Sequence, residues 1–311
     1  MIHAGIIGGA GYAAGELIRI LLQHPYVKLD FVNSNSQQDK YLYEVHRDLI
    51  GETDMRFSGE ITPEVDALFL CMGHGRSRKY IENHQNLLSS QTLIIDLSQD
   101  FRIQNPHHDF VYGLPEINRE KISKAKHIAN PGCFATGIEL ALLPMAANDL
   151  LKSEVQIHGI TGSTGAGQEP KPATHFSWRN NNISVYKAFQ HQHLKEIRQS
   201  VLQLQPEYKE SLNFIPLRGG FSRGILVSAY TDCPLEEAEL REKIKVFYDK
   251  HPFTFVTNEN PDIKQVVNTN KALVYAEKHG NKALLISVTD NLLKGASGQA
   301  VQNLNLMMGW D

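Results

Sequence analysis

Cysteine is scarce in this chain: its 311 residues contain three, Cys71, Cys133 and Cys233. An odd and sparse set fits no disulfide framework, so we expect reduced thiols and a cytoplasmic location. Cys71 lies in a predicted apolar strand, and Cys233 lies near the end of another. Both are interpreted as small structural hydrophobic residues.

Long apolar runs are also lacking, since no stretch reaches the roughly 18 residues of a membrane-spanning helix. The chain opens on Met1 to Ile7 without a charged leader or cleavage site, so no targeting segment is predicted. We find no internal repeats, low-complexity tracts or blocks of like charge. The net charge is only −3, and neither nucleic acid nor a membrane surface is therefore expected as a partner.

The chain is 41% hydrophobic and 21% charged, as in a soluble globular protein with a sizeable core. The length suits two domains. Strand character in the first part is found at 2–7, 28–33, 67–72 and 92–97, and helical spacing at 16–22. Strands that alternate with helices predict an α/β fold with a doubly wound parallel sheet of the Rossmann type.

The pattern changes after a buried helix predicted over 134–145. Strand character recurs at 155–160, 224–231, 273–277 and 282–288, with a charged, periodic helix over 235–250. Few helices separate these strands, which predicts an α+β domain on a mixed or antiparallel sheet. The final segment, 298–308, is helical and could return to the first domain.

A glycine-rich turn follows the first predicted strand. Gly8-x-x-Gly11, with Gly15 further on, matches a relaxed dinucleotide fingerprint that opens a helix. Glycine permits the tight turn and lets backbone N–H groups approach a pyrophosphate. A simple strand–helix turn is the alternative. The position of the turn, between the first strand and a clear helix, favours dinucleotide binding.

The end of the second strand indicates which dinucleotide. NAD enzymes usually place an acid there for the ribose 2′-hydroxyl. Here Ser34, Asn35 and Ser36 offer hydroxyl and amide donors, and no acid occurs before Asp39. These donors would tolerate a 2′-phosphate, so NADP(H) is the predicted cofactor. The alternative is a solvated polar loop.

Cys133 lies where a loop of turn-forming residues, 129–132, meets the buried helix. Unpaired N–H groups and the helix dipole favour an anion at such a junction. The thiolate is the nucleophilic form of cysteine, and this position stabilises it. Together with the dinucleotide turn, Cys133 predicts an enzyme that forms a covalent thioester.

A nucleophilic thiol needs an acid/base partner. His191 and His193 open a predicted helix, and their spacing points them in different directions, so one of the two is expected to reach the thiol. Surface histidines are the alternative. No cysteine or carboxylate set completes a tetrahedral site with them, and no metal is predicted.

Several motifs resemble the N-acetyl-γ-glutamyl-phosphate reductases of arginine biosynthesis. In chain order they are Gly8-x-x-Gly11-Tyr12-x-x-Gly15-Glu16-Leu17, residues 111–116, residues 130–136, residues 163–167, His191-x-His193 with Glu196-Ile197, Arg223-Gly224-Ile225, and residues 290–303. These matches run from residue 5 to about 309. The last is long and specific, so the resemblance extends over nearly the whole chain.

The resemblance implies a cofactor domain, 1–132 plus 293–311, and a substrate and oligomerisation domain, 133–292, of the glyceraldehyde-phosphate dehydrogenase type. It implies NADPH-dependent reduction of an acyl phosphate to an aldehyde by a homo-oligomer, dimer or tetramer. Cys133 would be the nucleophile and His193 the acid/base, with His191 a close second. The implied cofactor contacts, with the donors named above, are Gly8, Gly11, Tyr12, Ser34, Asn35, Ser36, Gly165 and Asn291.

The substrate carries a phosphate and a carboxylate, which require cations. Arg102, Arg223 and Lys171 are candidates, and surface arginines are the alternative. The family usually has Phe-x-Pro-His-Leu-x-Pro before its Arg-Gly-Ile, and this chain departs from that pattern. In this chain the run is Phe214-Ile215-Pro216-Leu217-Arg218, so Leu217 stands at the histidine position and Arg218 at the next. Arginine suits a carboxylate. Arg218 could therefore bind the extra carboxylate of an N-succinyl substrate, or could simply close a loop.

Three rival functions remain open from the sequence. A sister reductase acting on aspartyl phosphate would share the nucleophile, but the run at 290–303 argues against it. An aminoadipyl phosphate is a further possible substrate. A non-catalytic NADP-binding regulator is the rival from another class, and the presence of Cys133 and His193 argues against that.

Overall fold

The computed structural model describes residues 1–60, 64–84 and 91–310. They form two compact units, Met1–Pro131 with Ala296–Asp311, and Gly132–Gly295. The sequence placed the second boundary at 292–293. Gly295, the last residue of the second unit, packs against Asn291 and Cys133.

The first unit is built on a parallel sheet of order β3-β2-β1-β4-β5-β7-β6. This order begins as in Rossmann folds, which confirms the predicted class. Its strands are β1 (Ile2–Ile7), β2 (Val27–Asn33), β3 (Phe57–Ser58), β4 (Ala67–Leu70), β5 (Leu93–Asp96), β6 (Val111–Tyr112) and β7 (His127–Ala129). Its helices are α1 (Tyr12–Leu22), α2 (Leu42–Val45), α3 (Ser77–Asn83), α4 (Pro115–Ile122) and α9 (Ser297–Met308).

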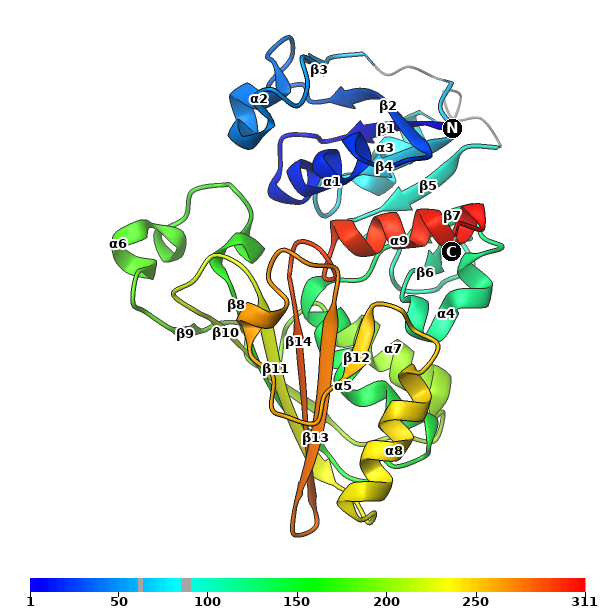
Figure 1. Cartoon of the computed structure of the whole chain (residues 1–311), viewed down its shortest axis with the longest axis vertical. Helices are drawn as coiled ribbons and strands as arrows, with labels where there is room; N and C mark the ends of the chain where they lie inside the picture. The colour runs from blue at the N-terminus through cyan, green and yellow to red at the C-terminus, as the bar shows by residue number, and fades with distance from the viewer. Residues whose placement is uncertain (61–63, 85–90, 311) are drawn as a thin grey trace. The chain divides into compact units, whose positions relative to one another are not determined.

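Apolar side chains cover both faces of this parallel sheet. One cluster joins alternate strand residues, such as Ile6 and Phe69, to α1 and α9, which pack side by side (Figure 1). The other cluster joins Leu68 and Ile94 to Tyr80 of α3. Burial on two faces explains why these strands are continuous apolar runs. The last helix thus returns to the first unit.

The second unit has a mixed sheet of order β12-β13-β14-β11-β8-β10-β9. The pairs β8–β10 and β12–β13 are parallel, and the other described pairs are antiparallel. The strands are β8 (Val155–Thr161), β9 (Ser184–Val185), β10 (Leu212–Arg218), β11 (Ile225–Asp232), β12 (Thr254–Val256), β13 (Ala272–His279) and β14 (Lys282–Thr289). The helices are α5 (Cys133–Ala147), α6 (Phe176–Arg179), α7 (Leu194–Leu204) and α8 (Glu237–Tyr248).

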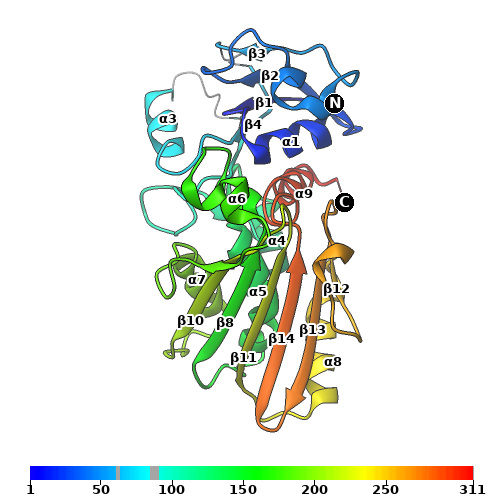
Figure 2. The same cartoon turned by 90° about the vertical axis from the view of Figure 1, so that its left-hand side faces the viewer.

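The core of this unit lies on one face of the mixed sheet, against α5, α7 and α8 (Figure 2). Helix α5 is buried on all sides from Phe134 to Ala146. Pro144 lies inside it and has no N–H for the carbonyl of Leu140, but the hydroxyl of Tyr248 donates to that oxygen at 2.6 Å. A side chain of α8 thereby lets the helix continue through a proline.

The sequence missed several short elements and one long strand, β10. Pro216 interrupts the strand pattern of β10. It is tolerated because β9 pairs with β10 only at Leu217 and Arg218, while β8 follows the whole strand on the other side. The predicted α+β architecture of the second unit is otherwise confirmed.

Candidate active site

Cys133 is the first residue of α5, and its side chain is half-buried. Gly132 precedes it as the N-cap in extended backbone. The thiol therefore stands at the positive end of a 15-residue helix. This is the position that the sequence predicted for the nucleophile.

Gly295 forms one wall around this thiol. A Cβ atom on Gly295 would lie 2.9 Å from Cys133 Cβ and 2.9 Å from the backbone of Asn291. Neither group can move without displacing a main chain. The absence of a side chain at Gly295 is therefore needed for the observed position of the cysteine.

A buried carboxylate links the start of α5 to the predicted acid/base. Glu196 lies in the first turn of α7, and its Oε2 accepts a hydrogen bond from the N–H of Gly132 at 3.0 Å. Its Oε1 is 3.8 Å from Nε2 of His193. The Glu196 carboxylate thus lies beside both the N-cap of α5 and the predicted acid/base.

His191 lies in an aromatic environment. Its ring contacts Phe134, Tyr186 and Phe214, and its Nδ1 accepts a hydrogen bond from the N–H of His193 at 3.3 Å. Burial lowers the pKa of His191 to about 4, with smaller contributions from the Lys187 and Arg218 cations. A ring with so low a pKa is a weak base. The carboxylate of Glu196 lies beside His193, so His193 is favoured for that role.

Arg218 lies at the end of β10, beside this cluster. Its guanidinium is centred 4.5 Å above the Tyr186 ring. Burial, with a smaller contribution from Cys133, raises the pKa of Tyr186 to about 12. Within the described parts of the chain, Arg218 forms no ion pair with a carboxylate. The structure thus brings an uncompensated cation to the vicinity of the thiol.

The other predicted substrate cations are placed differently. Asp290 binds Arg223 through two hydrogen bonds, of 3.0 Å and 3.1 Å. Lys171 is exposed and lies 3.5 Å from Glu169. Arg102 belongs to the first unit. It is buried and donates to the carbonyls of Asn130 and Leu97, at 2.8 Å and 3.1 Å.

Asn291 and Gly165 lie in the second unit. Asn291 Oδ1 accepts from the N–H of Gly224 at 2.7 Å, and its Nδ2 donates to Thr164 Oγ1 at 3.0 Å. Gly165 lies in the short 3₁₀ helix Ser163–Ala166. Asn291 therefore connects this turn to the start of β11.

The glycine-rich turn of the first unit fits a dinucleotide. Gly8 has φ of +83°, and a Cβ there would lie 2.8 Å from the backbone of Cys71. Gly11 is the N-cap of α1, and a Cβ there would meet no atom within 4 Å. Tyr12, the first residue of α1, is 41% exposed. An open approach to a helix N-terminus suits a pyrophosphate.

The end of β2 carries the predicted ribose-binding donors. Ser34 is buried, whereas Asn35 and Ser36 are exposed. The hydroxyls of Ser34 and Ser36 are 3.5 Å apart. The segment Ser34–Ser36 contains no carboxylate.

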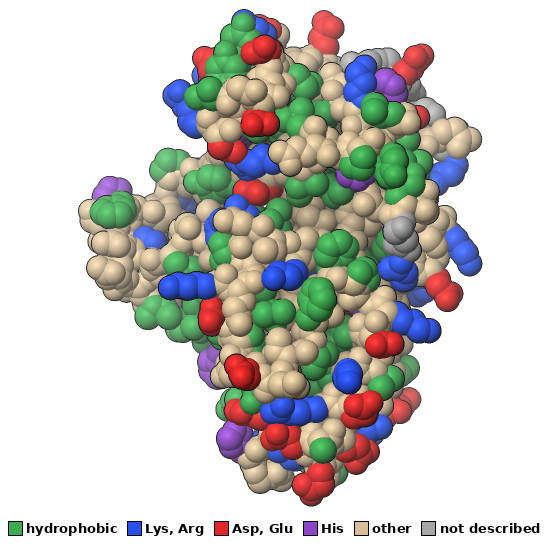
Figure 3. All heavy atoms as spheres, in the orientation of Figure 1, with side chains coloured by type: hydrophobic (Ala, Val, Ile, Leu, Met, Phe, Trp, Pro, Cys, Tyr) green, Lys and Arg blue, Asp and Glu red, His purple; other side chains and the backbone are tan. Residues whose placement is uncertain are grey.

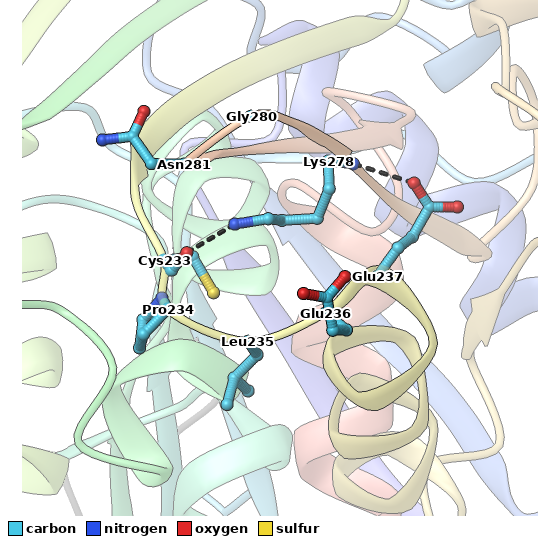
Figure 4. A pocket seen from close by; sticks show the side chains of 8 residues that line it. All are labelled: Cys233, Pro234, Leu235, Glu236, Glu237, Lys278, Gly280 and Asn281. Atoms are coloured by element: carbon cyan, nitrogen blue, oxygen red, sulfur yellow. Dashed lines mark hydrogen bonds between the residues drawn. The ribbon is translucent and has the colours of Figure 1, made fainter.

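Neither of the other two cysteines, Cys71 and Cys233, is the first residue of a helix. Burial raises the pKa of Cys71 to about 12. Cys233 is buried beside a hollow in the second unit, where Lys278 Nζ donates to the Cys233 carbonyl (Figure 4). Within the described residues, no His, Cys, Asp and Glu side chains form a group able to hold a metal ion.

Comparison with known proteins relates this site to a family. Residues 3–125 match the NAD-binding domain of semialdehyde dehydrogenases, and residues 133–291 match their dimerisation domain. A Parabacteroides distasonis protein named N-acetyl-gamma-glutamyl-phosphate reductase is 56% identical over 310 residues, 99% of this chain and 96% of that protein. The chain belongs to the N-acetyl-gamma-glutamyl-phosphate reductase family. Proteins of the same name from Christiangramia forsetii and Flavobacterium johnsoniae are 56% and 53% identical, each over 99% of this chain and 96% of their own length.

Solved structures agree at the level of the fold. Aspartate semialdehyde dehydrogenase II from Vibrio cholerae, complexed with ASA, has a TM-score of 0.74 at 16% identity, covering 99% of this chain and 98% of that one. A probable aspartate-semialdehyde dehydrogenase from Pseudomonas aeruginosa has a TM-score of 0.77, with the same identity and coverage.

Family membership confirms the predicted enzyme class. The chain is an oxidoreductase of amino-acid biosynthesis with a nicotinamide dinucleotide cofactor, and the dimerisation-domain match supports a homo-oligomer. In the described parts of the chain, no helix has both the length and the apolar character needed to cross a bilayer.

Sequence reasoning assigned no role to three residues of this cluster. Glu196 accepts from Gly132, Tyr186 lies beneath the Arg218 guanidinium, and Arg179 donates to the Arg218 carbonyl at 2.6 Å. Glu196 carried the clearest signal, since an acid three residues after His193 shares its helix face. Tyr186 and Arg179 carried none, because their contacts depend on how the loop before His191 folds.

Proposed function

We propose that this chain reduces N-acetyl-L-glutamyl 5-phosphate to N-acetyl-L-glutamate 5-semialdehyde, with NADPH as the reductant and a thioester on Cys133. The arrangement that carries this proposal is Cys133 at the start of α5, tied through Gly132 and Glu196 to His193. The proposed setting is arginine biosynthesis in the cytoplasm, by a dimer or tetramer.

The chemistry of the thiol follows from its position. The Cys133 thiolate attacks the acyl carbon, the carbon–oxygen bond to phosphate breaks, and inorganic phosphate leaves. The positive end of α5 stabilises the developing oxyanion. When bound, the nicotinamide supplies hydride to the thioester carbon. The carbon–sulfur bond then breaks, the aldehyde leaves, and the thiolate is restored.

His193 is the proposed acid/base, and it moves the proton of the thiohemiacetal oxygen. The Glu196 carboxylate orients its ring and balances its charge. His191 serves instead as a neutral ring that packs against Phe134 and holds the backbone of His193 through Nδ1.

NADP(H) is proposed over NAD(H) because of Ser34, Asn35 and Ser36. Gly8, Gly11 and Tyr12 would hold the pyrophosphate from the first unit. Asn291 and Gly165 are proposed to shape the wall of the nicotinamide site from the second unit, since both polar ends of the Asn291 side chain are bound to its own unit.

Arg218 is the proposed ligand for a substrate anion, with Lys171 as an exposed second cation. Asp290 already binds the Arg223 guanidinium, and two backbone carbonyls bind that of Arg102. We therefore propose that these two arginines position the chain rather than neutralise the substrate.

The deciding experiment is the reverse reaction. Purified protein should reduce NADP in the presence of inorganic phosphate and N-acetyl-glutamate semialdehyde, and omission of phosphate should abolish the reaction. NADP reduction that does not depend on phosphate, or that requires aspartate semialdehyde instead, would contradict the proposal.

An N-succinyl substrate is the second candidate, and the observation that favours it is the uncompensated charge of Arg218. Relative kcat/KM for N-succinyl, N-acetyl and aminoadipyl semialdehydes tests it, in the parent and in Arg218→Ala. We expect the variant to lose at least about tenfold more on the substrate with the extra carboxylate. Preference for N-acetyl in the parent that survives the substitution would exclude this candidate.

A further inference from the structure

His46 is a buried histidine of the first unit to which the proposed mechanism gives no role. It follows α2 directly and is 5% exposed. Its Nε2 lies 2.8 Å from the carbonyl oxygen of Gly9, in the glycine-rich turn 37 residues earlier. A carbonyl oxygen can only accept, so Nε2 is the ring nitrogen that carries the proton. Burial lowers the pKa of His46, which favours the neutral ring.

The same ring fills the space beside Gly15, in the first turn of α1. A Cβ atom on Gly15 would lie 2.6 Å from Nδ1 of His46 and 2.8 Å from its Cε1. Beyond the neighbouring backbone, the three atoms nearest to that Cβ all belong to this ring. The last glycine of a dinucleotide fingerprint usually permits a helix to pack closely on a strand. Here it makes room for an imidazole.

The backbone around Gly9 is held from two sides. The N–H groups of Gly8 and Gly9 donate to the carbonyl of Asn33, the last residue of β2, at 3.0 Å and 2.8 Å. The Gly9 carbonyl in turn accepts from His46. The peptide group between Gly9 and Ala10 therefore cannot rotate without breaking the bond to the imidazole.

The segment that carries His46 is fixed to the first unit by contacts of its own. Asp48 accepts from the Arg19 guanidinium of α1 through both carboxylate oxygens. Leu42 and Leu49, on either side of His46, are buried in the core. Figure 3 shows basic and acidic side chains close together on the surface over α1 and α2. The fold of this segment thus brings the ring to the turn.

We propose that His46 is a positioning residue for the dinucleotide cofactor, because its ring sets the shape of the turn between Gly9 and Gly15. The first N–H groups of a helix have no partners within it, and they bind a pyrophosphate when the preceding turn leaves them accessible. A turn that already has its bound shape loses less freedom on binding. This inference rests on the proposed contact between the pyrophosphate and the glycine-rich turn.

The first test compares His46→Leu with His46→Gln. Leucine removes the donor to the Gly9 carbonyl, whereas the amide of glutamine can replace Nε2 as that donor. Fluorescence titration should give a dissociation constant for NADPH about tenfold higher in His46→Leu, and within about threefold of the parent in His46→Gln. In the phosphate-dependent reverse reaction, the KM of His46→Leu for NADP should rise while kcat stays within about twofold of the parent.

His24→Leu is the matched control for a loss of stability. His24 lies just beyond the opposite end of α1, and its Nε2 is 3.0 Å from Oδ1 of Asn305 in the same unit. The substitution should lower the free energy of unfolding, as His46→Leu does. The dissociation constant for NADPH should stay at the parent value.

Gly15→Ala tests the ring from its other side. In the parent, the added methyl group meets the imidazole, and the dissociation constant for NADPH should rise at least about tenfold. In a His46→Ala background the methyl group has room. Gly15→Ala should then change the dissociation constant by less than about twofold, so the two substitutions are strongly non-additive.

Three outcomes would overturn the inference. If His46→Leu binds NADPH as the parent does, or if His24→Leu weakens binding equally, the ring serves only the stability of the fold. Additive effects of Gly15→Ala and His46→Ala would mean that the ring does not shape the turn. A parent protein that binds neither NADPH nor NADH would remove the proposed cofactor contact itself, whereas the first two outcomes leave that contact in place.

Discussion

Gly295 carries no side chain, and Cys133 Cβ occupies the space that one would need. The catalytic geometry thus depends on a residue that contributes no chemistry. A steric requirement of this kind is different from the usual reason for glycine in a turn, which is a positive φ.

We predict that Gly295→Ala lowers kcat by roughly a hundredfold, because displacement of a nucleophile by about 1 Å has an effect of that size. Iodoacetamide alkylation of Cys133 should change in rate as well, while NADPH affinity is retained. Lys245→Ala, at an exposed position of α8, is the control. Equal kcat values in Gly295→Ala and the parent would show that the cysteine tolerates the shift.

His191 makes stability depend on pH. Burial lowers its pKa to about 4, below the ordinary value of 6.5. The unfolded chain therefore binds a proton more readily than the folded one, and stability present above pH 6.5 is lost as the pH falls toward 4.

For His191→Gln, we predict that the decrease in unfolding free energy between pH 7 and pH 5 is smaller than in the parent by about 2 kcal/mol. Urea denaturation at the two pH values measures it. His107→Gln, at an exposed histidine, should show the same decrease in unfolding free energy between pH 7 and pH 5 as the parent. The same slope in His191→Gln as in the parent would mean that His191 titrates normally.

At the scale of elements, α5 joins three functions. Its first residue is the proposed nucleophile, its middle lies in the core of the second unit, and its last turn contains Pro144. The helix passes through that proline because the Tyr248 hydroxyl satisfies the Leu140 carbonyl.

Tyr248→Phe should destabilise the protein by about 1–3 kcal/mol, because a buried carbonyl loses its donor. In a Pro144→Ala background, the N–H of residue 144 can donate to the Leu140 carbonyl. Tyr248→Phe should therefore lower the free energy of unfolding by less in that background. A double-mutant cycle of urea midpoints measures the difference. Additive effects would show that the proline and the tyrosine are independent.

Element position also explains why Glu196 and His193 reach α5. Both lie at the start of α7, which packs alongside α5. The acid three residues after the histidine was readable from the sequence. Its bond to Gly132 was not, because it connects residues 64 positions apart.

At the scale of the whole molecule, the proposed pyrophosphate and ribose contacts and the proposed nucleophile belong to different units. Gly8, Gly11 and the donors at the end of β2 lie in Met1–Pro131, and Cys133 lies in Gly132–Gly295. Binding of NADPH and the covalent step should therefore respond separately to substitution.

Cys133→Ser should lower turnover by at least about a thousandfold, since a hydroxyl is a far weaker nucleophile than a thiolate. NADPH affinity, measured by fluorescence titration, should stay within about twofold of the parent. Retained turnover would rule out the thioester route.

The local sequence was sufficient for the glycine turn, the strands of both sheets that are continuous apolar runs, and Cys133 at a loop–helix junction. These features depend on backbone preferences and burial patterns within a few residues. Tertiary packing alone decided that Asp290 binds Arg223, that Arg218 is left without a counter-ion, and that His193 rather than His191 is paired with Glu196. Each of those outcomes depends on which distant charge or ring lies within a few ångströms, because electrostatic and hydrogen-bonding partners are set by the folded chain and not by neighbours in sequence.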